Sequence, residues 1–284
     1  MKTTRLLLSL LLSLALTCAC FAPAAFAVDV PLQYVVLGDS IGYGAGVLNP
    51  DEACYGRIVA DTNGYDYQNH AVSGNKTEHL LRHLDRAEVS AAVRQADIIS
   101  ISIGGNDYLT DNVTGLVLDA TFRNDYSRMD KITAQLKLNF AAIIEKIRAL
   151  NPDAVILMQT LYNPGTGINK APYQAATNRL NDLIRDYLAS HPGAFTIVDV
   201  AAAFGTDRSY IAQDSIHPSA RGNERIAEVI LRTLKTLGLG DATVPVVLHK
   251  GVDQNDHSLS AIPLRLQMFR YLFELMRYYM TMQK

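Results

Sequence analysis

The sequence predicts an α/β protein in which a central parallel sheet of five strands carries helices on both faces. Short apolar runs rich in β-branched residues alternate five times with longer segments of helical periodicity. Strands that alternate with helices form parallel sheets through right-handed crossovers. The chain has 284 residues, 49% of them hydrophobic, which is enough to bury a sizeable core. We expect the main domain to cover residues 28–240.

The first predicted strand begins the stretch from Gln33 to Gly46, where the apolar run from Tyr34 to Leu37 stops at Gly38. The other four strands are expected at residues 65–69, 97–103, 154–161 and 195–200. Helical spacing is expected at residues 55–62, 77–96, 129–150, 172–188 and from Pro218-Ser219 to about 237. Residues 111–128 lack strong periodicity, and we expect an irregular loop that shapes the substrate site.

Residues 1–27 have the order of parts that is typical of a secretory signal. Lys2 and Arg5 precede an apolar run at residues 6–16, and Ala25-Phe26-Ala27 supplies small residues for cleavage after Ala27. The apolar run is too short to cross a bilayer. We therefore expect a secreted protein that acts outside the cell or in its envelope.

The three cysteines indicate a mature chain without an internal disulfide. Cys18 and Cys20 lie in the leader, and Cys54 is the third. Lipidation of Cys18 or Cys20 is an alternative, although Ala15 and Thr17 stand where lipoprotein signals usually carry leucine. Cys54 is expected to be a buried structural thiol, since no catalytic spacing surrounds it.

The C-terminal extension, residues 241–284, departs from the alternating pattern. Residues 244–260 resemble a loop, and residues 263–280 form a strongly apolar helical pattern with a narrow polar stripe. Such a helix packs back on the domain, pairs with a second chain, or lies on a membrane surface. Packing on protein is the simplest of these interpretations. The formal charge of -2 gives no indication of a nucleic-acid partner.

Ser40 lies just past the carboxyl end of the first predicted strand, where open α/β sheets place their ligands. A serine hydroxyl becomes a nucleophile only when a base takes its proton and donors stabilise the oxyanion that it creates.

Asp214 and His217 supply a base in the predicted loop before the last helix. Their spacing allows the carboxylate to accept a hydrogen bond from one imidazole nitrogen while the other nitrogen acts as the base. A lone His-Pro pair would more often be a helix entry with a surface histidine, so this interpretation depends on Ser40.

Gly74 and Asn106 are candidate oxyanion donors. Gly74 allows a backbone N–H to approach a reacting atom without an intervening side chain, and Asn106 follows the strand at residues 97–103 after two glycines. An ordinary turn at Gly74, and an Asx-type turn or helix cap at Asn106, are the plainer alternatives.

Two further patterns indicate no cofactor. His79 and His83 are four residues apart, but no third metal ligand is in reach, so a solvated helix face is favoured. Gly42-x-Gly44-x-Gly46 lacks the spacing of a dinucleotide fingerprint, which ranks a nucleotide-binding protein last. We expect neither a metal nor an organic cofactor.

Four blocks together resemble the SGNH, or GDSL-type, hydrolase superfamily. They are Gly38-Asp39-Ser40, the Asn69 to Gly74 segment, Gly105-Asn106-Asp107, and Asp214-x-x-His217-Pro218. The resemblance covers most of the mature chain. It implies a flavodoxin-like three-layer α/β/α sandwich and a secreted esterase, lipase or acylhydrolase.

The resemblance also implies roles for single residues. Ser40 is the nucleophile, His217 the general base and then acid, and Asp214 the residue that orients His217. The Ser40 and Gly74 backbone N–H groups and the Asn106 side chain hold the oxyanion, and Asp39 is not a catalytic acid. The expected substrate is a small-molecule or lipid-like ester. A carbohydrate O-deacetylase and a non-catalytic surface-binding module remain as alternatives.

Overall fold

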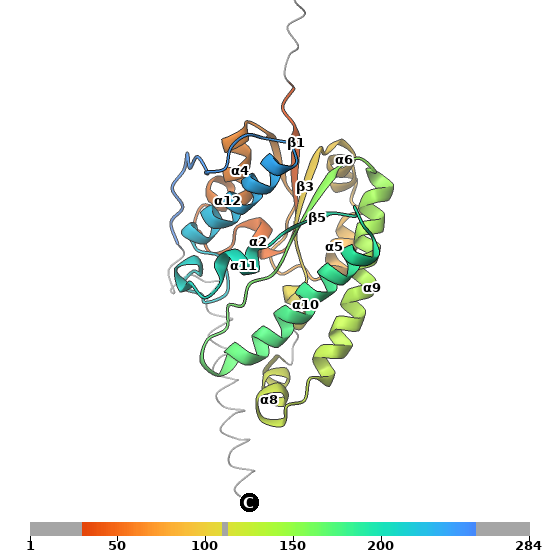
Figure 1. Ribbon diagram of the computed structural model, residues 1–284, viewed down its shortest axis with the longest axis vertical. Helices are drawn as coiled ribbons and strands as arrows, with labels where there is room; N and C mark the ends of the chain where they lie inside the picture. Colours follow the sequence, from red (N-terminus) through yellow and green to blue (C-terminus); the bar gives the residue numbers. More distant parts are fainter. Residues whose placement is uncertain (1–29, 110–112, 254–284) are drawn as a thin grey trace, which may run out of the picture. The chain divides into compact units, whose positions relative to one another are not determined.

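The computed structural model describes residues 30–109 and 113–253 (Figure 1). The predicted signal at residues 1–27 and the predicted helix at residues 263–280 lie outside the described residues. From Leu32 onward, the described chain belongs to one compact unit.

The centre of this unit is a sheet of five parallel strands in the order β2-β1-β3-β4-β5. This is the flavodoxin-like order, so the predicted fold is confirmed. The strands are β1 (Gln33–Gly38), β2 (Asp66–Asn69), β3 (Ile98–Ser102), β4 (Val155–Gln159) and β5 (Thr196–Val198). The order reverses between β1 and β3, which is where ligands bind in sheets of this kind.

Helices cover both faces of the sheet (Figure 1). One face carries α4 (Tyr55–Asn63), α11 (Val200–Phe204) and α12 (Ala220–Thr236), and the other carries α5 (Thr77–His83), α6 (Ala87–Gln95), α9 (Ser127–Leu150) and α10 (Lys170–Ser190). Shorter helices are α2 (Ser40–Tyr43), α3 (Pro50–Ala53), α7 (Gly105–Tyr108) and α8 (Val113–Arg123), with 3₁₀ turns η1 (Gly167–Asn169) and η2 (Arg208–Tyr210).

Alternate side chains of β1 enter two separate apolar cores. Tyr34 and Val36 pack beneath α4 and α12, whereas Val35 and Leu37 pack beneath α5, α6 and α9. All four are at most 1% exposed, which agrees with a strand buried on both faces. Burial on both faces of the sheet therefore explains why these four successive residues are apolar.

Two expectations for the helices were wrong. Residues 113–123 of the expected loop form α8, whose buried Leu116, Val117 and Ala120 follow helical spacing. The helix expected at residues 77–96 is two helices, α5 and α6. Their junction is closed by the Ser90 hydroxyl, which donates to the Leu84 carbonyl at 2.7 Å.

Residues 241–253, called here the C-terminal strap, contain no helix or strand beyond an isolated bridge at Asp253. The strap follows α12 and turns back past α4, where the Val246 N–H donates to the Thr62 hydroxyl at 2.9 Å (Figure 1, blue). The expected loop at residues 244–260 therefore agrees with the structure up to residue 253.

Over residues 30–109 and 113–253, the structure contains no helix that is long and apolar enough to cross a membrane.

Candidate active site

The turn that presents Ser40 depends on a glycine. Gly38 ends β1 with a φ of +126°, and a Cβ atom there would lie 1.9 Å from the Ser102 carbonyl oxygen of β3. Only glycine permits this approach together with this backbone conformation. The chain then leaves the sheet and Ser40 becomes the first residue of α2, 7% exposed.

The Asp39 side chain holds the same turn in place through two hydrogen bonds. Its Oδ1 accepts hydrogen bonds from the Ile41 N–H at 3.0 Å and from the Ser102 hydroxyl at 3.1 Å. The side chain is 3% exposed, and burial raises the pKa of Asp39 to about 6. Asp39 therefore caps α2 and ties it to β3.

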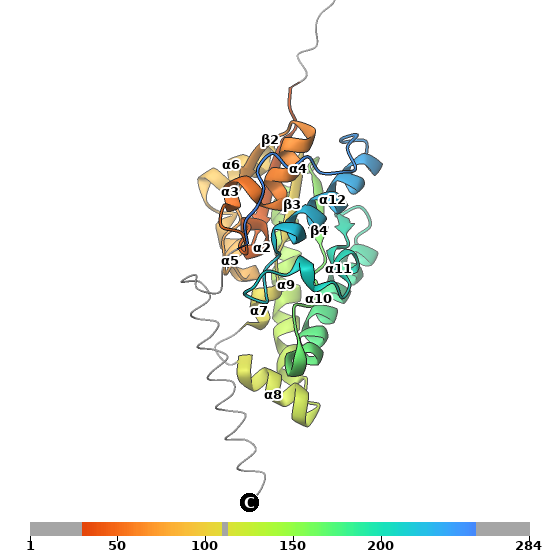
Figure 2. The same ribbon diagram turned by 90° about the vertical axis from the view of Figure 1, so that its left-hand side faces the viewer.

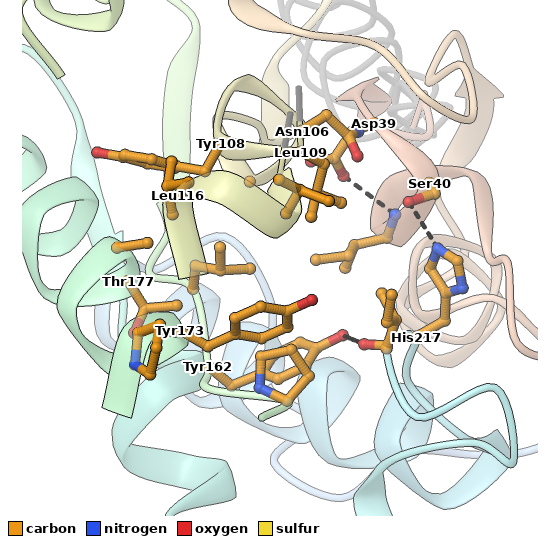
Figure 3. A pocket seen from close by; sticks show the side chains of 18 residues that line it. Asp39, Ser40, Asn106, Tyr108, Leu109, Leu116, Tyr162, Tyr173, Thr177 and His217 are labelled. Carbon is orange, nitrogen blue, oxygen red and sulfur yellow. Dashed lines mark hydrogen bonds between the residues drawn. The ribbon is translucent and has the colours of Figure 1, made fainter. Parts of the chain in front are cut away.

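The structure brings Ser40, His217 and Asp214 together. Figure 3 shows the hydrogen bond between Ser40 and His217. The His217 Nε2 lies 2.9 Å from the Ser40 Oγ, and the His217 Nδ1 lies 2.6 Å from the Asp214 Oδ2. The arrangement can supply a nucleophile, a base that is hydrogen-bonded to it, and a carboxylate that is hydrogen-bonded to the base and orients it.

The loop that carries His217 is held by hydrogen bonds between its backbone and two side chains. The Asp214 Oδ1 accepts from the N–H groups of Ile216 and His217, each at 2.9 Å. The Tyr162 hydroxyl donates to the Ile216 carbonyl at 2.7 Å. Burial opposes ionisation of Asp214, but hydrogen bonds from the His217 side chain and backbone outweigh it and lower the pKa of Asp214.

Asn106 lies in α7, directly beyond the carboxyl end of β3, and lines the same cavity as Ser40 and His217. Its Nδ2 donates one hydrogen to the Asn75 carbonyl oxygen at 2.9 Å, which leaves a second hydrogen on this amide. Asn75 in turn donates from its own Nδ2 to the Gly38 carbonyl at 3.2 Å. Sequence reasoning missed Asn75, because only the folded chain shows that this amide is buried.

Gly74 lies in the turn before Asn75 and is solvent-exposed. The Asn75 N–H donates to the Val72 carbonyl at 3.1 Å, and Gly74 has a φ of +84°, as the third residue of a type II turn requires. Gly74 is not among the residues that line the cavity. Its connection to the site runs through Asn75.

A cavity of about 80 Å³ opens beside Ser40. Most of its lining is aliphatic or aromatic, and Figure 3 shows Tyr108, Leu116, Tyr162 and Tyr173 around it. Sequence reasoning did not find these residues. Tyr162 could have been found from its place just after β4, at the edge of the sheet that carries Ser40.

The geometry agrees with a comparison against known families. The model of the GDSL-like lipase/acylhydrolase family matches residues 36–225. The chain belongs to this family.

Two Bacillus proteins are similar in sequence to this GDSL-like chain. It is 29% identical to an uncharacterised protein, YpmR, of Bacillus subtilis strain 168, over 72% of this chain and 81% of that protein. It is 28% identical to the spore germination lipase LipC of Bacillus licheniformis, over 69% and 93%. The structure of the lipase Lip_vut3 from a goat rumen metagenome covers 74% of this chain and 99% of that one, at 26% identity and a TM-score of 0.58. The GDSL-like chain is thus a hydrolase of the esterase and lipase class.

The metal and nucleotide alternatives gain no support within the described part of the GDSL-like chain. No group of three or more His, Cys, Asp or Glu side chains there could hold a metal ion. The His79 Nε2 lies 3.3 Å from the Glu78 carboxylate, a contact that is typical of a solvated helix face. Gly44 ends α2 and Gly46 packs on Pro218, so both glycines have structural roles.

Cys54, the third cysteine, is fully buried and free. Its Sγ lies 3.3 Å from the Tyr67 hydroxyl.

Proposed function

We propose that the protein is a secreted serine esterase that hydrolyses carboxylic esters of apolar acyl groups through an acyl-enzyme on Ser40. The observation that carries the proposal is the hydrogen-bonded series from Ser40 through His217 to Asp214, 2.9 and 2.6 Å, at the edge of an apolar cavity. Secretion is inferred from the signal-like residues 1–27.

The reaction has two halves. The Ser40 Oγ attacks the ester carbonyl carbon while the His217 Nε2 takes the hydroxyl proton, and the bond to the alcohol oxygen then breaks as His217 protonates that oxygen. Water attacks the acyl-enzyme in the same way, gives its proton to His217, and the acid leaves as Ser40 regains a proton. Asp214 holds the His217 tautomer and stabilises the imidazolium in both halves.

Oxyanion stabilisation falls to three N–H donors. Ser40 is the first residue of α2, so its backbone N–H has no acceptor within that helix. Asn106 lines the cavity and keeps one amide hydrogen beyond the bond to Asn75. Gly74 contributes its backbone N–H if the turn at residues 72–75 closes toward the bound ester. Donors of this kind act where charge develops in the transition state.

The cavity supports an acyl group of medium length. At about 80 Å³ it has room for roughly five to eight water-sized groups, and its walls offer few polar partners. Each methylene moved from water into such a site contributes about 0.8 kcal/mol, which is about fourfold in kcat/KM. The name of the Bacillus licheniformis relative, a lipase, favours the same substrate class.

The two alternative functions gain less support. A sugar O-deacetylase needs polar groups for its carbohydrate, whereas the cavity beside Ser40 is mostly apolar. A non-catalytic binding module would have no need of a base within hydrogen-bond reach of a serine.

Hydrolysis of p-nitrophenyl esters from acetate to palmitate tests the proposal, with residues 28–284 assayed beside the Ser40→Ala variant. We expect kcat/KM to rise about fourfold per methylene until the cavity is filled. Ser40→Ala should lose turnover, and intact mass spectrometry should detect an acyl adduct on the wild-type protein only. Turnover that survives Ser40→Ala would contradict the proposal, and an optimum at acetate would favour the deacetylase.

A further inference from the structure

We propose that Asp253 is a positioning residue, which holds Ser40 and His217 at hydrogen-bond distance by joining the loop after α2 to the start of α12. The inference rests on the proposed serine esterase activity, and it adds one residue of the C-terminal strap to those that position the catalytic side chains. The strap lies beyond residues 36–225, the part of the chain that the family model matches.

Asp253 is bonded on one side to the loop that follows Ser40. Its backbone forms an antiparallel bridge with Val47, and beside it the Leu48 N–H donates to the Val252 carbonyl at 2.7 Å. Figure 2 shows the strap passing α3 and α4 toward α2 before it reaches this loop. The strap therefore adds a short strand-like pairing to the segment that leaves the nucleophile.

On its other side, Asp253 caps the helix that follows His217. The Asp253 Oδ1 accepts a hydrogen bond from the Ala220 N–H, the first of α12, at 2.6 Å. Ser219 is the N-cap residue of α12, and its hydroxyl accepts from the Gly222 N–H in the same turn at 3.0 Å. The first N–H groups of a helix have no partners within it, so each such cap holds the helix start in place.

The two segments that Asp253 joins touch each other directly behind the catalytic pair. A Cβ atom on Gly46 would lie 2.3 Å from the Pro218 carbonyl oxygen and 3.0 Å from the His217 Cβ. This contact packs the backbone of one loop on the residue that supplies the base. Asp253 is bonded to both sides of it, one residue after Gly46 and two residues after Pro218.

Gly251 allows the strap to pack closely against α12 and α3. A Cβ atom on Gly251 would lie 2.9 Å from the Ala220 Cβ and 3.2 Å from the Ala53 Cβ. A larger residue at 251 would therefore push the strap away from α12.

Loss of the Asp253 carboxylate should affect the chemical step more than substrate binding. The residues that line the cavity come from the β1–α2 turn, α7, α8, α10 and the loops after β4 and before α12, and none belongs to the strap. Releasing the α12 start loosens His217 relative to Ser40, and a misplacement on the order of 1 Å costs about a hundredfold in rate.

The test compares Asp253→Ala with Asp253→Asn, whose amide oxygen still accepts from Ala220. Asp125→Ala is the matched control, because the Asp125 side chain accepts from the Ser127 N–H at the start of α9 at 2.9 Å and Asp125 does not line the cavity. Two rates are measured: kcat and KM for p-nitrophenyl butyrate, and the phosphonylation of Ser40 by a fluorophosphonate probe, followed by intact mass.

We expect Asp253→Ala to lower both kcat and the phosphonylation rate about ten- to hundredfold with KM unchanged. Asp253→Asn should stay within about threefold of wild type, and Asp125→Ala should not change either rate. If Asp253→Ala does not fold, Gly251→Val replaces it, because a larger side chain at 251 moves Asp253 away from the Ala220 N–H. This variant should likewise lower kcat and leave KM unchanged.

Wild-type rates in Asp253→Ala, or equal losses in the alanine and asparagine variants, would overturn the inference. Wild-type rates in Gly251→Val, where that variant stands in, would overturn it as well. A wild-type protein that the probe leaves unmodified would instead contradict the proposed serine esterase, and the inference with it.

Discussion

Asn106 donates from its Nδ2 to the backbone carbonyl of Asn75, 2.9 Å away, and so ties the start of α7 to the loop that follows β2. The same loop is bonded to the end of β1 through the Asn75 side chain and the Gly38 carbonyl. Two asparagines thus connect the segments after β1, β2 and β3, and the side chain of Asn106 is fixed where it lines the cavity.

Asn106→Ala tests this amide as an oxyanion donor. Removal of one such donor typically costs about 3 to 4 kcal/mol of transition-state stabilisation, so kcat should fall on the order of a hundredfold to a thousandfold. Steady-state hydrolysis of p-nitrophenyl butyrate measures the loss. Wild-type turnover in the purified, folded variant would exclude Asn106 from this role.

Ala176→Phe tests the assignment of the cavity to the acyl group. Ala176 is on α10, lines the cavity and is 8% exposed. A phenyl ring there excludes the distal methylenes, and loss of two buried methylenes lowers kcat/KM by about fifteenfold. We expect that loss for the octanoate ester and little change for acetate. Asn178→Phe, on the exposed face of the same helix, is the control, and equal effects in both variants would contradict the assignment.

Gly38→Ala should destabilise the fold by more than backbone strain alone. The new Cβ would meet the Ser102 carbonyl at 1.9 Å in addition to the strain of a positive φ, so we expect a loss of about 2 to 5 kcal/mol. Gly64 also has a positive φ, +70°, but has open space around it, so Gly64→Ala should cost about 1 to 2 kcal/mol. Urea unfolding measures both, and equal losses would show that β1 and β3 tolerate the clash.

The raised pKa of Asp39 predicts that the stability of the fold decreases as the pH rises. Burial raises its pKa from 3.8 to about 6, so between these values the folded protein keeps a proton that the unfolded chain has released. Stability from this group is therefore present below pH ~4 and is lost as pH rises through about 6. The difference of about two pH units corresponds to about 3 kcal/mol.

Asp39→Asn removes that titration. The free energy of unfolding of the wild type, minus that of the variant, should fall by about 2 kcal/mol between pH 4 and pH 7, since part of the change already occurs below pH 4. Urea unfolding at intervals of one pH unit gives this difference directly. A difference that stays constant over the range would mean that Asp39 is not held as a buried acid.

The central strands could be predicted because their cause is local. Tyr34 to Leu37 are all apolar since β1 is buried on both faces, and the run shows this without knowledge of its neighbours. Ser40, Asn106 and His217 could be placed for a related reason. Each follows a recognisable strand end or precedes a helix start, and parallel strands bring their carboxyl ends to one edge.

The remaining features depend on contacts between distant parts of the chain. The helical spacing of Leu116, Val117 and Ala120 is present in the sequence, whereas the break between α5 and α6 contains no glycine or proline that would indicate it. Asn75 and Asp253 lie in loops. Asn75 is hydrogen-bonded to Gly38 and Asn106, 37 and 31 residues away, and the Asp253 side chain is hydrogen-bonded to Ala220, 33 residues away. No pattern within either loop indicates such partners.

The position of the strap also sets an order of events during synthesis. Chains are made from the N-terminus, so the sheet strands, Ser40 and His217 all leave the ribosome before Asp253. A chain cut within residues 241–253 would keep the five strands of the described sheet together with Ser40, Asp214 and His217. If Asp253 positions His217 as proposed, such a chain would fold but hydrolyse esters slowly, so the active site would be completed only when Asp253 has reached the start of α12.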